Sequence, residues 1–552
     1  MTSENFTQIA GSAIATYCAE YPDEATFLGE HSNDHRLGDP SVAGQQRRQS
    51  ELSTLIGRLD ALPAGELDTG DRIDRDILRT VAEGELLGLT EIDEGSWNPM
   101  LHNPGQSLYG LLSRDFAPLP DRLASLAGRL RAVPDHLEAG RARLRDMSRI
   151  HVETAIGQLE GTLGLIESEI PAALAEAGNP LDLTAEISRA ATAVRAYQDW
   201  LRGELPAAQR SARLGKDLFA RKLELVLATP WQPSSLLQQA YADLDRIEAE
   251  LAELVGRTTG SGTADRAAIA AEFDRLAADV PTSDTILQLC RDALTETTEF
   301  VRRHDLLTLL DDPVEVIEMP EIDRGVAVAY CVPVGALEAA PLVTQFAVSP
   351  TPKDWSADRV RSFYREYNNH MLHNLTIHEA MPGHVEQLSH AYRYRGSNQV
   401  RGVFGSGSFI EGWATYAEEL MAGRGYRSDI SEAAAAAVRM QQLKMQLRAV
   451  LNTILDISFH TGDLDEREAM ELMLVRGYQE EGEAAGKWRR VQLSSTQLCT
   501  YFVGYVEVRE LVADLRRARP SWSDRQLHDE LLNYGSPPVR YLRQLLELPP
   551  AA

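Results

Sequence analysis

Helical periodicity is the feature that most restricts the fold of this 552-residue chain. Over residues 3–310, apolar residues recur three and four positions apart, and Pro or Gly separates one run from the next. Leu223, Val226 and Leu227 show this spacing shortly before Pro230. Such spacings place side chains on one face of an α-helix. We therefore expect a mainly α-helical protein.

The length of the chain predicts a division into lobes. Single hydrophobic cores rarely grow to this size without splitting. We expect two lobes around a cleft. The first, residues 1–310, is expected to be helical, and the second, residues 311–552, to combine a small sheet with a helical metal-binding region.

One region rich in β-forming residues interrupts the helical pattern. It contains three runs bounded by Pro and Gly, Val314–Ile317, Val326–Tyr330 and Val343–Val348. Runs of this kind are typical of short strands, so we expect a small β-sheet. If the last run is an edge strand, it could bind an extended peptide by strand addition. A hairpin that only covers the core is the alternative.

Composition excludes several classes of partner. The chain has 82 acidic and 55 basic residues, a net charge of −27 and no concentrated basic face, so we do not expect nucleic acid binding. No segment has the apolar length that spans a bilayer, and the first residues lack the pattern of a secretory signal. We therefore expect a cytoplasmic protein without a membrane partner. Its four cysteines are scattered, which is typical of small buried hydrophobic residues.

Two short segments supply the side chains of a metal site. Residues 378–384 read His-Glu-Ala-Met-Pro-Gly-His, and a second segment begins at Glu411 with Glu-Gly-Trp-Ala-Thr-Tyr-Ala-Glu. A catalytic zinc commonly takes three ligands from His and Asp or Glu, while a nearby Glu accepts a proton from water. We predict His378, His384 and Glu411 as ligands of Zn²⁺. Glu379 is then the general base.

The spacing of the two histidines requires a break in the helix. Six positions on a regular helix rotate the second ring by about 240° from the first, so a straight helix cannot direct both at one ion. Pro382 lacks an N–H, and its ring would collide with the carbonyl of His378. Gly383 tolerates unusual dihedral angles. We therefore expect a bulge or kink that turns His384 toward the metal.

Two helices are expected to carry these segments. Ser356 is a suitable N-cap for a helix over residues 357–381, which delivers the first segment. A second helix, starting near Phe409, carries Glu411. The three ligands thus come from two separate segments of the chain.

The motifs together resemble a known family. His-Glu-x-x-Pro-Gly-His-x-x-Gln, ending at Gln387, and the segment from Glu411 to Glu418 resemble the bacterial domain of unknown function 885 family. The resemblance covers essentially the whole chain as one family domain and continues through Arg448 and residues 456–460, 497–504, 528 and 535–538. The family is similar to helical zinc peptidases of the angiotensin-converting-enzyme and thermostable carboxypeptidase kind, which implies a zincin-like metallopeptidase fold. This chain departs from the family pattern at Val385, where another His is common, and at residues 495–496, where Pro-Gly is common.

A polar stripe lies downstream of the motifs. Arg448, Asn452, Asp456 and His460 recur every fourth residue along an apolar helix. Buried polar groups need partners, so the stripe either forms a structural Arg448–Asp456 network or lines the cleft. We favour the cleft. His460 would then donate a hydrogen bond to the substrate carbonyl or the developing oxyanion.

Further candidates complete the site. Tyr501, which matches the tyrosine position of the family, is a second oxyanion donor. Glu418 either hydrogen-bonds a ligating imidazole and fixes its tautomer or is an exposed carboxylate. Arg448, Arg490 and Arg509 are candidate anchors for the terminal carboxylate of a peptide, and salt bridges are the alternative role.

The sequence therefore predicts a zinc hydrolase, most simply a metallopeptidase that cleaves short peptides. A mononuclear non-haem iron oxygenase is a second interpretation, because two His and one carboxylate also bind Fe(II). Glu379 favours zinc, since an oxygenase needs no base there. A non-catalytic peptide-binding protein on a peptidase scaffold is the third. The cleaved bond and the oligomeric state are left open.

Overall fold

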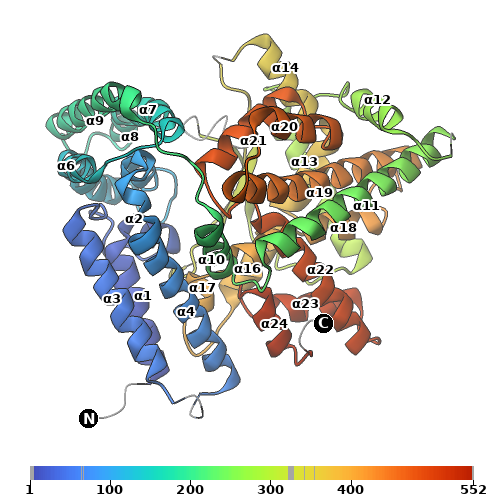
Figure 1. The fold of residues 1–552 in the computed structure, drawn as a ribbon, viewed down its shortest axis with the longest axis horizontal. Coiled ribbons are helices and arrows are strands. Elements are labelled where there is room, and N and C mark those ends of the chain that lie inside the picture. The colour runs from blue at the N-terminus through green and yellow to red at the C-terminus, as the bar shows by residue number, and fades with distance from the viewer. Residues whose placement is uncertain are drawn as a thin grey trace. The chain divides into compact units, whose positions relative to one another are not determined.

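The computed structural model describes residues 5–63, 65, 67–260, 262–320, 328–340, 342–353 and 355–549. It confirms the prediction of a mainly helical chain with one small sheet (Figure 1). Among the described residues, none of the helices combines the length and the apolar character that crossing a membrane requires.

The chain divides into two compact units. Unit 1 comprises Met1–Ala212, Val334–Leu342 and Arg395–Val403, and unit 2 comprises Arg213–Pro333, Val343–Tyr394 and Phe404–Ala552. This division differs from the expected boundary between residues 310 and 311. Periodicity shows that a segment is helical but not which segment it packs against, and residues 213–310 pack within unit 2.

Unit 1 is helical. Its α-helices are α1 (Phe6–Glu20), α2 (Pro22–Leu28), α3 (Val42–Asp60), α4 (Thr69–Leu87), α5 (Gly105–Tyr109), α6 (Leu119–Arg143), α7 (Arg149–Gly164), α8 (Ile170–Glu176), α9 (Thr184–Glu204) and α17 (Val400–Val403). The last of these joins the unit through the ion pair between Arg401 and Asp74, both buried.

Unit 2 contains the sheet and all of the predicted site residues. Its α-helices are α10 (Lys216–Leu227), α11 (Pro233–Thr259), α12 (Arg266–Leu276), α13 (Ile286–His304), α14 (Ala357–Glu366), α15 (Asn369–Glu379), α16 (His384–Arg393), α18 (Gly407–Gly423), α19 (Glu432–Thr461), α20 (Glu466–Glu471), α21 (Glu481–Leu493), α22 (Thr500–Ala518), α23 (Asp524–Leu532) and α24 (Val539–Leu545).

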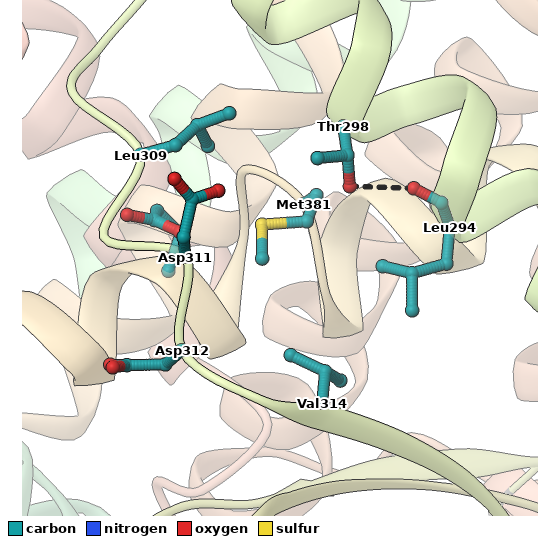
Figure 2. A pocket seen from close by; sticks show the side chains of 8 residues that line it. Leu294, Thr298, Leu309, Asp311, Asp312, Val314 and Met381 are labelled. Atoms are coloured by element: carbon teal, nitrogen blue, oxygen red, sulfur yellow. Dashed lines mark hydrogen bonds between the residues drawn. The ribbon is translucent and has the colours of Figure 1, made fainter.

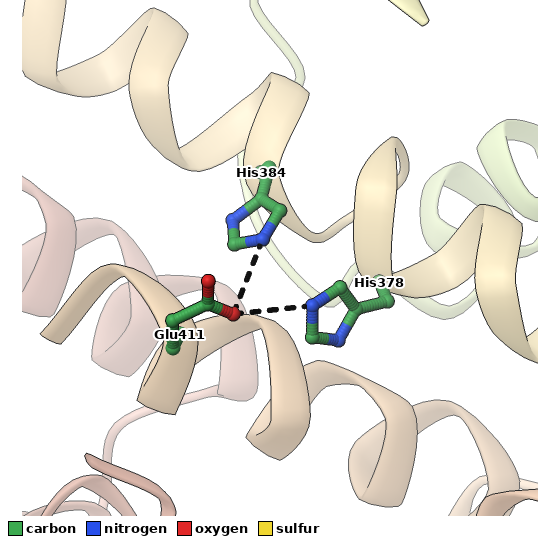
Figure 3. A group of neighbouring side chains, drawn as sticks. All are labelled: His378, His384 and Glu411. Atoms are coloured by element: carbon green, nitrogen blue, oxygen red, sulfur yellow. Dashed lines mark ion pairs between the residues drawn. The ribbon is translucent and has the colours of Figure 1, made fainter. Parts of the chain in front are cut away.

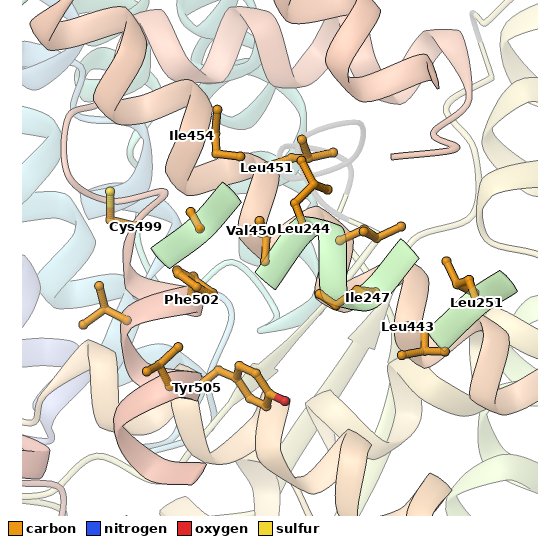
Figure 4. Packing of buried hydrophobic residues seen from close by; sticks show 14 of the residues in the cluster. Leu244, Ile247, Leu251, Leu443, Val450, Leu451, Ile454, Cys499, Phe502 and Tyr505 are labelled. Carbon is orange, nitrogen blue, oxygen red and sulfur yellow. The ribbon is translucent and has the colours of Figure 1, made fainter. Parts of the chain in front are cut away.

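The long helix α19 is the centre of one hydrophobic core. Leu244, Ile247 and Leu251 of α11 pack against α19, as Figure 4 shows. Phe502 of α22 completes the cluster from another side. Because α11 buries its apolar face here, residues 233–259 belong with unit 2, which contains the predicted metal ligands.

Helices α18 and α22 approach each other unusually closely. A Cβ added to Gly504 would lie 1.9 Å from the backbone oxygen of Ser408, and one added to Gly412 would lie 2.3 Å from the carbonyl carbon of Gly504. Only glycine allows this backbone contact. The contact fixes α18, which carries Glu411, against α22.

The sheet has the strand order β1-β3-β2, with β1 (Val314–Glu318), β2 (Ala329–Val332) and β3 (Thr344–Val348). β1 is parallel and β2 antiparallel to β3. The expectation that residues 343–348 form an edge strand is wrong, because β3 is the central strand and has a neighbour on each side. A peptide therefore cannot be added to it. Val326 and Ala327 of the second predicted run lie outside the described residues.

The helix expected over residues 357–381 is in fact two helices. Ser356 caps α14 as predicted, through a hydrogen bond from the N–H of Arg359. The chain then breaks at Tyr367, and the Asn368 side chain caps α15 by accepting the N–H groups of residues 370 and 371. A second capping residue inside the segment thus starts a new helix.

Candidate metal centre

A four-residue turn separates the helices that carry the two histidines. α15 ends at Glu379 and α16 begins at His384, so the expected kink within one helix is a complete break between two helices. The turn contains a cis peptide bond before Pro382. Gly383 donates its N–H to the carbonyl of Ile377, and a Cβ at Gly383 would lie 1.9 Å from the carbonyl oxygen of His378. Only glycine fits this close approach.

The three predicted ligands lie together at this turn. His378 stands in the last turn of α15, His384 opens α16 and Glu411 comes from α18, as Figure 3 shows. Nε2 of His378 is 3.3 Å and Nε2 of His384 is 3.5 Å from Oε2 of Glu411. One ligand atom from each residue lies within 4.8 Å of the others. Both rings are buried, and they meet edge to face.

The donor set fits a metal ion. Oε2 of Glu411 is buried, yet it makes no hydrogen bond with any described residue despite the two imidazoles beside it. Ligand atoms bonded at about 2.1 Å in a tetrahedron are separated by about 3.4 Å, close to both observed separations. Two imidazoles and one carboxylate are ligands that zinc accepts.

The same imidazoles act on the Glu411 carboxyl. Burial alone would raise its pKa, but His378 and His384 outweigh burial and hold the pKa of Glu411 well below its usual range. A carboxyl that stays ionised is a suitable metal ligand, because coordination requires the deprotonated form.

Glu418 sets the tautomer of His378. Its Oε1 lies 2.7 Å from Nδ1 of His378, and its Oε2 accepts a hydrogen bond of 2.7 Å from the amide of Asn374. A carboxylate can only accept here, so Nδ1 carries a proton, and Nε2, on the side of Glu411, is the nitrogen that would bind a metal. The buried position of Glu418 excludes the alternative of an exposed carboxylate. Asn374 was not predicted, although its position one turn before His378 is a signal.

Trp413 holds the turn between the histidines. Its indole N–H donates a 2.8 Å hydrogen bond to the carbonyl of Pro382, and the side chain is fully buried. Helix α18 thus supplies a ligand, the contact to the turn and, through Glu418, the tautomer of His378. Trp413 lies inside the second motif, but the sequence does not reveal its partner.

Glu379 lies beside the three ligands as the last residue of α15. Burial raises its pKa, the imidazoles of His378 and His384 lower it, and the Glu411 carboxylate raises it again; the net effect is a rise. The backbone N–H of Cys331, in strand β2, donates a hydrogen bond to its carboxylate. A held carboxylate with a raised pKa is what a general base requires.

His460 is occupied within the fold. Nε2 lies 3.0 Å from the carbonyl of Val491 and 2.8 Å from that of Ser494, while Nδ1 accepts the N–H of Leu214. Burial lowers the pKa of His460 to about 4, so the ring is neutral at ordinary pH. Its single N–H already has acceptors, which favours a structural role over the predicted oxyanion contact.

The polar stripe splits into two parts. Asp456 accepts the backbone N–H groups of Thr496 and Cys499. Arg448 instead forms an ion pair with Glu483. No Arg448–Asp456 pair occurs among the described residues.

Tyr501 contacts an arginine in this structure. Its hydroxyl lies 3.4 Å from Nη2 of Arg490, which belongs to α21. Its predicted role toward the oxyanion stays a prediction.

A cavity of about 210 Å³ lies against the same turn (Figure 2). Met381 lines it together with Leu294, Leu309, Asp311 and Glu386. The buried Glu386 carboxylate already accepts the N–H of Leu310 and lies 3.3 Å from His390. The three ligands are not among the residues that line this cavity, so it is separate from the candidate metal centre.

Solved structures with the same fold extend over the whole chain. A "putative lipoprotein of unknown function" from Shewanella oneidensis is 27% identical, with a TM-score of 0.82 over 99% of this chain and 100% of that one. A "putative lipoprotein" from Colwellia psychrerythraea is 15% identical, with a TM-score of 0.80 over 98% of each chain. An M32 carboxypeptidase from Deinococcus radiodurans R1 is 13% identical over 92% of this chain and 94% of that one, and its TM-score of 0.36 is too low for inference.

No relative matches among the curated proteins. A family model, however, matches residues 22–546, nearly the full length. The chain therefore belongs to the family described as "Bacterial protein of unknown function (DUF885)".

Proposed function

We propose that the protein is a zinc-dependent hydrolase with a zincin-like centre, most simply a metallopeptidase that cleaves short peptides. The observation that carries this proposal is the convergence of His378, His384 and Glu411, with Glu379 beside them. A carboxylate next to such a set is the arrangement that metal-dependent amide hydrolysis uses.

Zn²⁺ held by His378, His384 and Glu411 would polarise the scissile carbonyl and acidify a water molecule. Glu379 accepts a proton from that water at its carboxylate as the water oxygen bonds to the carbonyl carbon. The C–N bond then breaks, and Glu379 returns the proton to the leaving amine. The N–H of Cys331 keeps the Glu379 carboxylate in place through these steps.

The experiment compares the wild-type protein with Glu379→Gln, each loaded with zinc and mixed with a library of short peptides. Mass spectrometry detects the products, and elemental analysis measures bound zinc. We expect cleavage by the wild type only, with equal zinc in both proteins. Glu510→Gln, which alters an exposed carboxylate on α22, is the matched control and should cleave like the wild type. Full turnover by Glu379→Gln would reject the assigned base.

The two rival functions give different results in the same preparation. An iron oxygenase would contain iron when purified without added metal and would consume oxygen. A peptide-binding protein would retain peptides without cleaving them in the metal-loaded form. The Glu379 carboxylate beside the three ligands favours hydrolysis over both.

A further inference from the structure

A group of charged side chains with more cations than carboxylates lies between α14, α19 and α21. We call it the cation cluster. It consists of Lys444, Arg448, Lys487 and Arg490, with the carboxylates of Glu366 and Glu483 and the hydroxyl of Tyr367. Four cations thus face two carboxylates.

Both carboxylates are already engaged. Glu366 accepts hydrogen bonds of 2.9 Å from Lys444 and from the backbone N–H of residue 480. Glu483 pairs with Arg448 through Oε1 and accepts the hydroxyl of Tyr367 at 3.1 Å through Oε2. Two cations, Lys487 and Arg490, therefore have no carboxylate of their own within the cluster.

Lys487 is the unusual member. Its side chain is 5% exposed, it donates no hydrogen bond to any described residue, and the nearest carboxylate oxygen, on Glu483, is 3.9 Å away. Burial lowers the pKa of Lys487 well below its usual value, and Arg448 and Arg490 lower it further. A buried ammonium that makes no hydrogen bond to the described residues and has only a distant carboxylate, at 3.9 Å, is costly, so an anion from outside the chain would stabilise the charged form of Lys487.

Arg490 is a solvent-exposed member of the cation cluster. It lies one turn after Lys487 on α21, is exposed, and contacts Gln497 at 2.9 Å and Tyr501 at 3.4 Å. A carboxylate that reached Lys487 along this side would meet two positive charges, one of them a guanidinium that can bind it through parallel hydrogen bonds.

A series of contacts connects the cluster to the helix that carries Glu411. Tyr367 lies two residues before the start of α15, which carries His378 near its other end. Tyr501 lies one turn before Gly504, whose backbone touches that of Gly412, the residue after Glu411. Arg490 is thus connected, through Tyr501 and the contact between α22 and α18, to the helix that carries Glu411.

We propose that Lys487 and Arg490 bind the C-terminal carboxylate of a short peptide substrate. This inference rests on the proposed function and narrows it to peptides with a free C-terminus. The other arginines named from the sequence are less suitable. Arg448 is paired with Glu483, and Arg509 lies over the ring of Tyr505.

The test measures binding rather than turnover. Zinc-loaded Glu379→Gln protein is mixed with two matched libraries of N-acetylated tetrapeptides, one with free C-termini and one with C-terminal amides. Ultrafiltration and mass spectrometry then give the fraction of each peptide retained. We expect the free carboxylate to be retained at least about tenfold more tightly than its amide, as loss of a buried charged contact implies. Equal retention of the two libraries, or retention of neither, overturns the inference.

Three further variants of the Glu379→Gln protein test whether Lys487 and Arg490 form the carboxylate site. Lys487→Met keeps the volume of the side chain and Arg490→Gln alters an exposed residue, so both are expected to fold. Each should remove most of the preference for free carboxylate, whereas the exposed control Lys216→Met should keep it. Preference unchanged in both cluster variants would overturn the assignment.

Further outcomes distinguish a C-terminal carboxylate from a side-chain carboxylate, and a failure of the carboxylate site from a failure of the proposed hydrolysis. Amidated peptides that carry Asp or Glu side chains should bind as weakly as other amides; retention equal to that of free C-termini would overturn the C-terminal assignment. If the wild-type protein cleaves no peptide while the preference for a free carboxylate persists, the proposed hydrolysis fails and the proposed carboxylate site stands. If the wild-type protein cleaves free and amidated peptides equally well and the two libraries bind alike, only the proposed carboxylate site at Lys487 and Arg490 fails.

Discussion

Glu418 accepts a hydrogen bond from Nδ1 of His378 while Asn374 donates a second one to its other oxygen, both at 2.7 Å. The carboxylate is buried, so it acts on the ring without competition from solvent. Nδ1 of His384, in contrast, has no hydrogen-bond partner among the described residues. The protein therefore fixes the tautomer of one histidine through a residue of α18 and positions the other mainly through the turn before α16.

Replacing Glu418 by Gln should weaken zinc binding. The amide removes the negative charge beside the His378 ring and places an N–H₂ against one of the two donors, so the ring is held less firmly. Loss of such a partner typically costs about 10- to 100-fold in metal affinity. Competition with a chromophoric chelator measures the dissociation constant. Glu419→Gln is the matched control, because Glu419 bonds the hydroxyl of Tyr505 and not a ligand. Equal zinc affinity in the two variants would contradict this role of Glu418.

Replacing Trp413 by Phe should destabilise the fold and the turn together. The change keeps an aromatic ring but removes the donor to the buried carbonyl of Pro382. An unpaired buried carbonyl costs about 1–3 kcal/mol. Urea unfolding of the metal-free protein measures the loss in free energy of unfolding, and chelator competition measures the accompanying fall in zinc affinity. Unchanged values in both measurements would show that the turn holds its shape without the indole.

The three predicted ligands lie together in the structure, but the contacts that support them could not be predicted from the sequence. Zinc chemistry restricts ligands to a few side chains, so the residue types and order of His378, His384 and Glu411 were sufficient to predict that these side chains meet. The contact from Trp413 to Pro382 depends on which helices pack together, and neither sequence segment predicts that packing. The break at Pro382 followed from its missing N–H, whereas its extent, two separate helices, depends on the fold around it.

Strand order and the polar stripe show the same limit. β3 is central because β1 pairs with it in parallel across a long connection, which local β-propensity does not reveal. Arg448 and Asp456 share one helix face but lie eight residues apart, about 12 Å along the axis, so each meets different neighbours. Spacing along one helix predicted that both would share one face, but it did not predict their partners.

Replacing Gly504 by Ala should destabilise unit 2. The added methyl group would lie 1.9 Å from the Ser408 backbone oxygen, so α18 and α22 would have to separate. Overpacking of this kind typically costs about 1–3 kcal/mol. Gly486→Ala on α21 is the control, since a Cβ there meets nothing within 4 Å and alanine should stabilise the helix by about 0.5–1 kcal/mol. Urea unfolding should therefore give opposite signs for the two variants, and the same sign would contradict the close approach of these helices.

Asp456 should make stability fall as the pH rises toward neutrality. Burial raises its pKa to about 7, against the lowering effect of the N–H groups of Thr496 and Cys499. The unfolded carboxyl titrates near 4. Between these values the native protein binds a proton that the unfolded chain has released, so the stabilisation present below about pH 4 is lost by about pH 7. The slope is about 1.4 kcal/mol per pH unit in this window.

The variant Asp456→Asn isolates this effect, because it keeps an acceptor oxygen and has no proton to release. His460, 3.6 Å away, has a pKa of about 4 and stays neutral through most of the window. Urea unfolding at pH 5, 6, 7 and 8 gives the free energy of unfolding of both proteins. The advantage of the wild type over Asp456→Asn should shrink by about 1 kcal/mol per unit from pH 5 to 7 and then level off. A constant difference would mean that the carboxyl ionises in the native protein at its ordinary pH, and the buried position of Asp456 would then require another compensating charge.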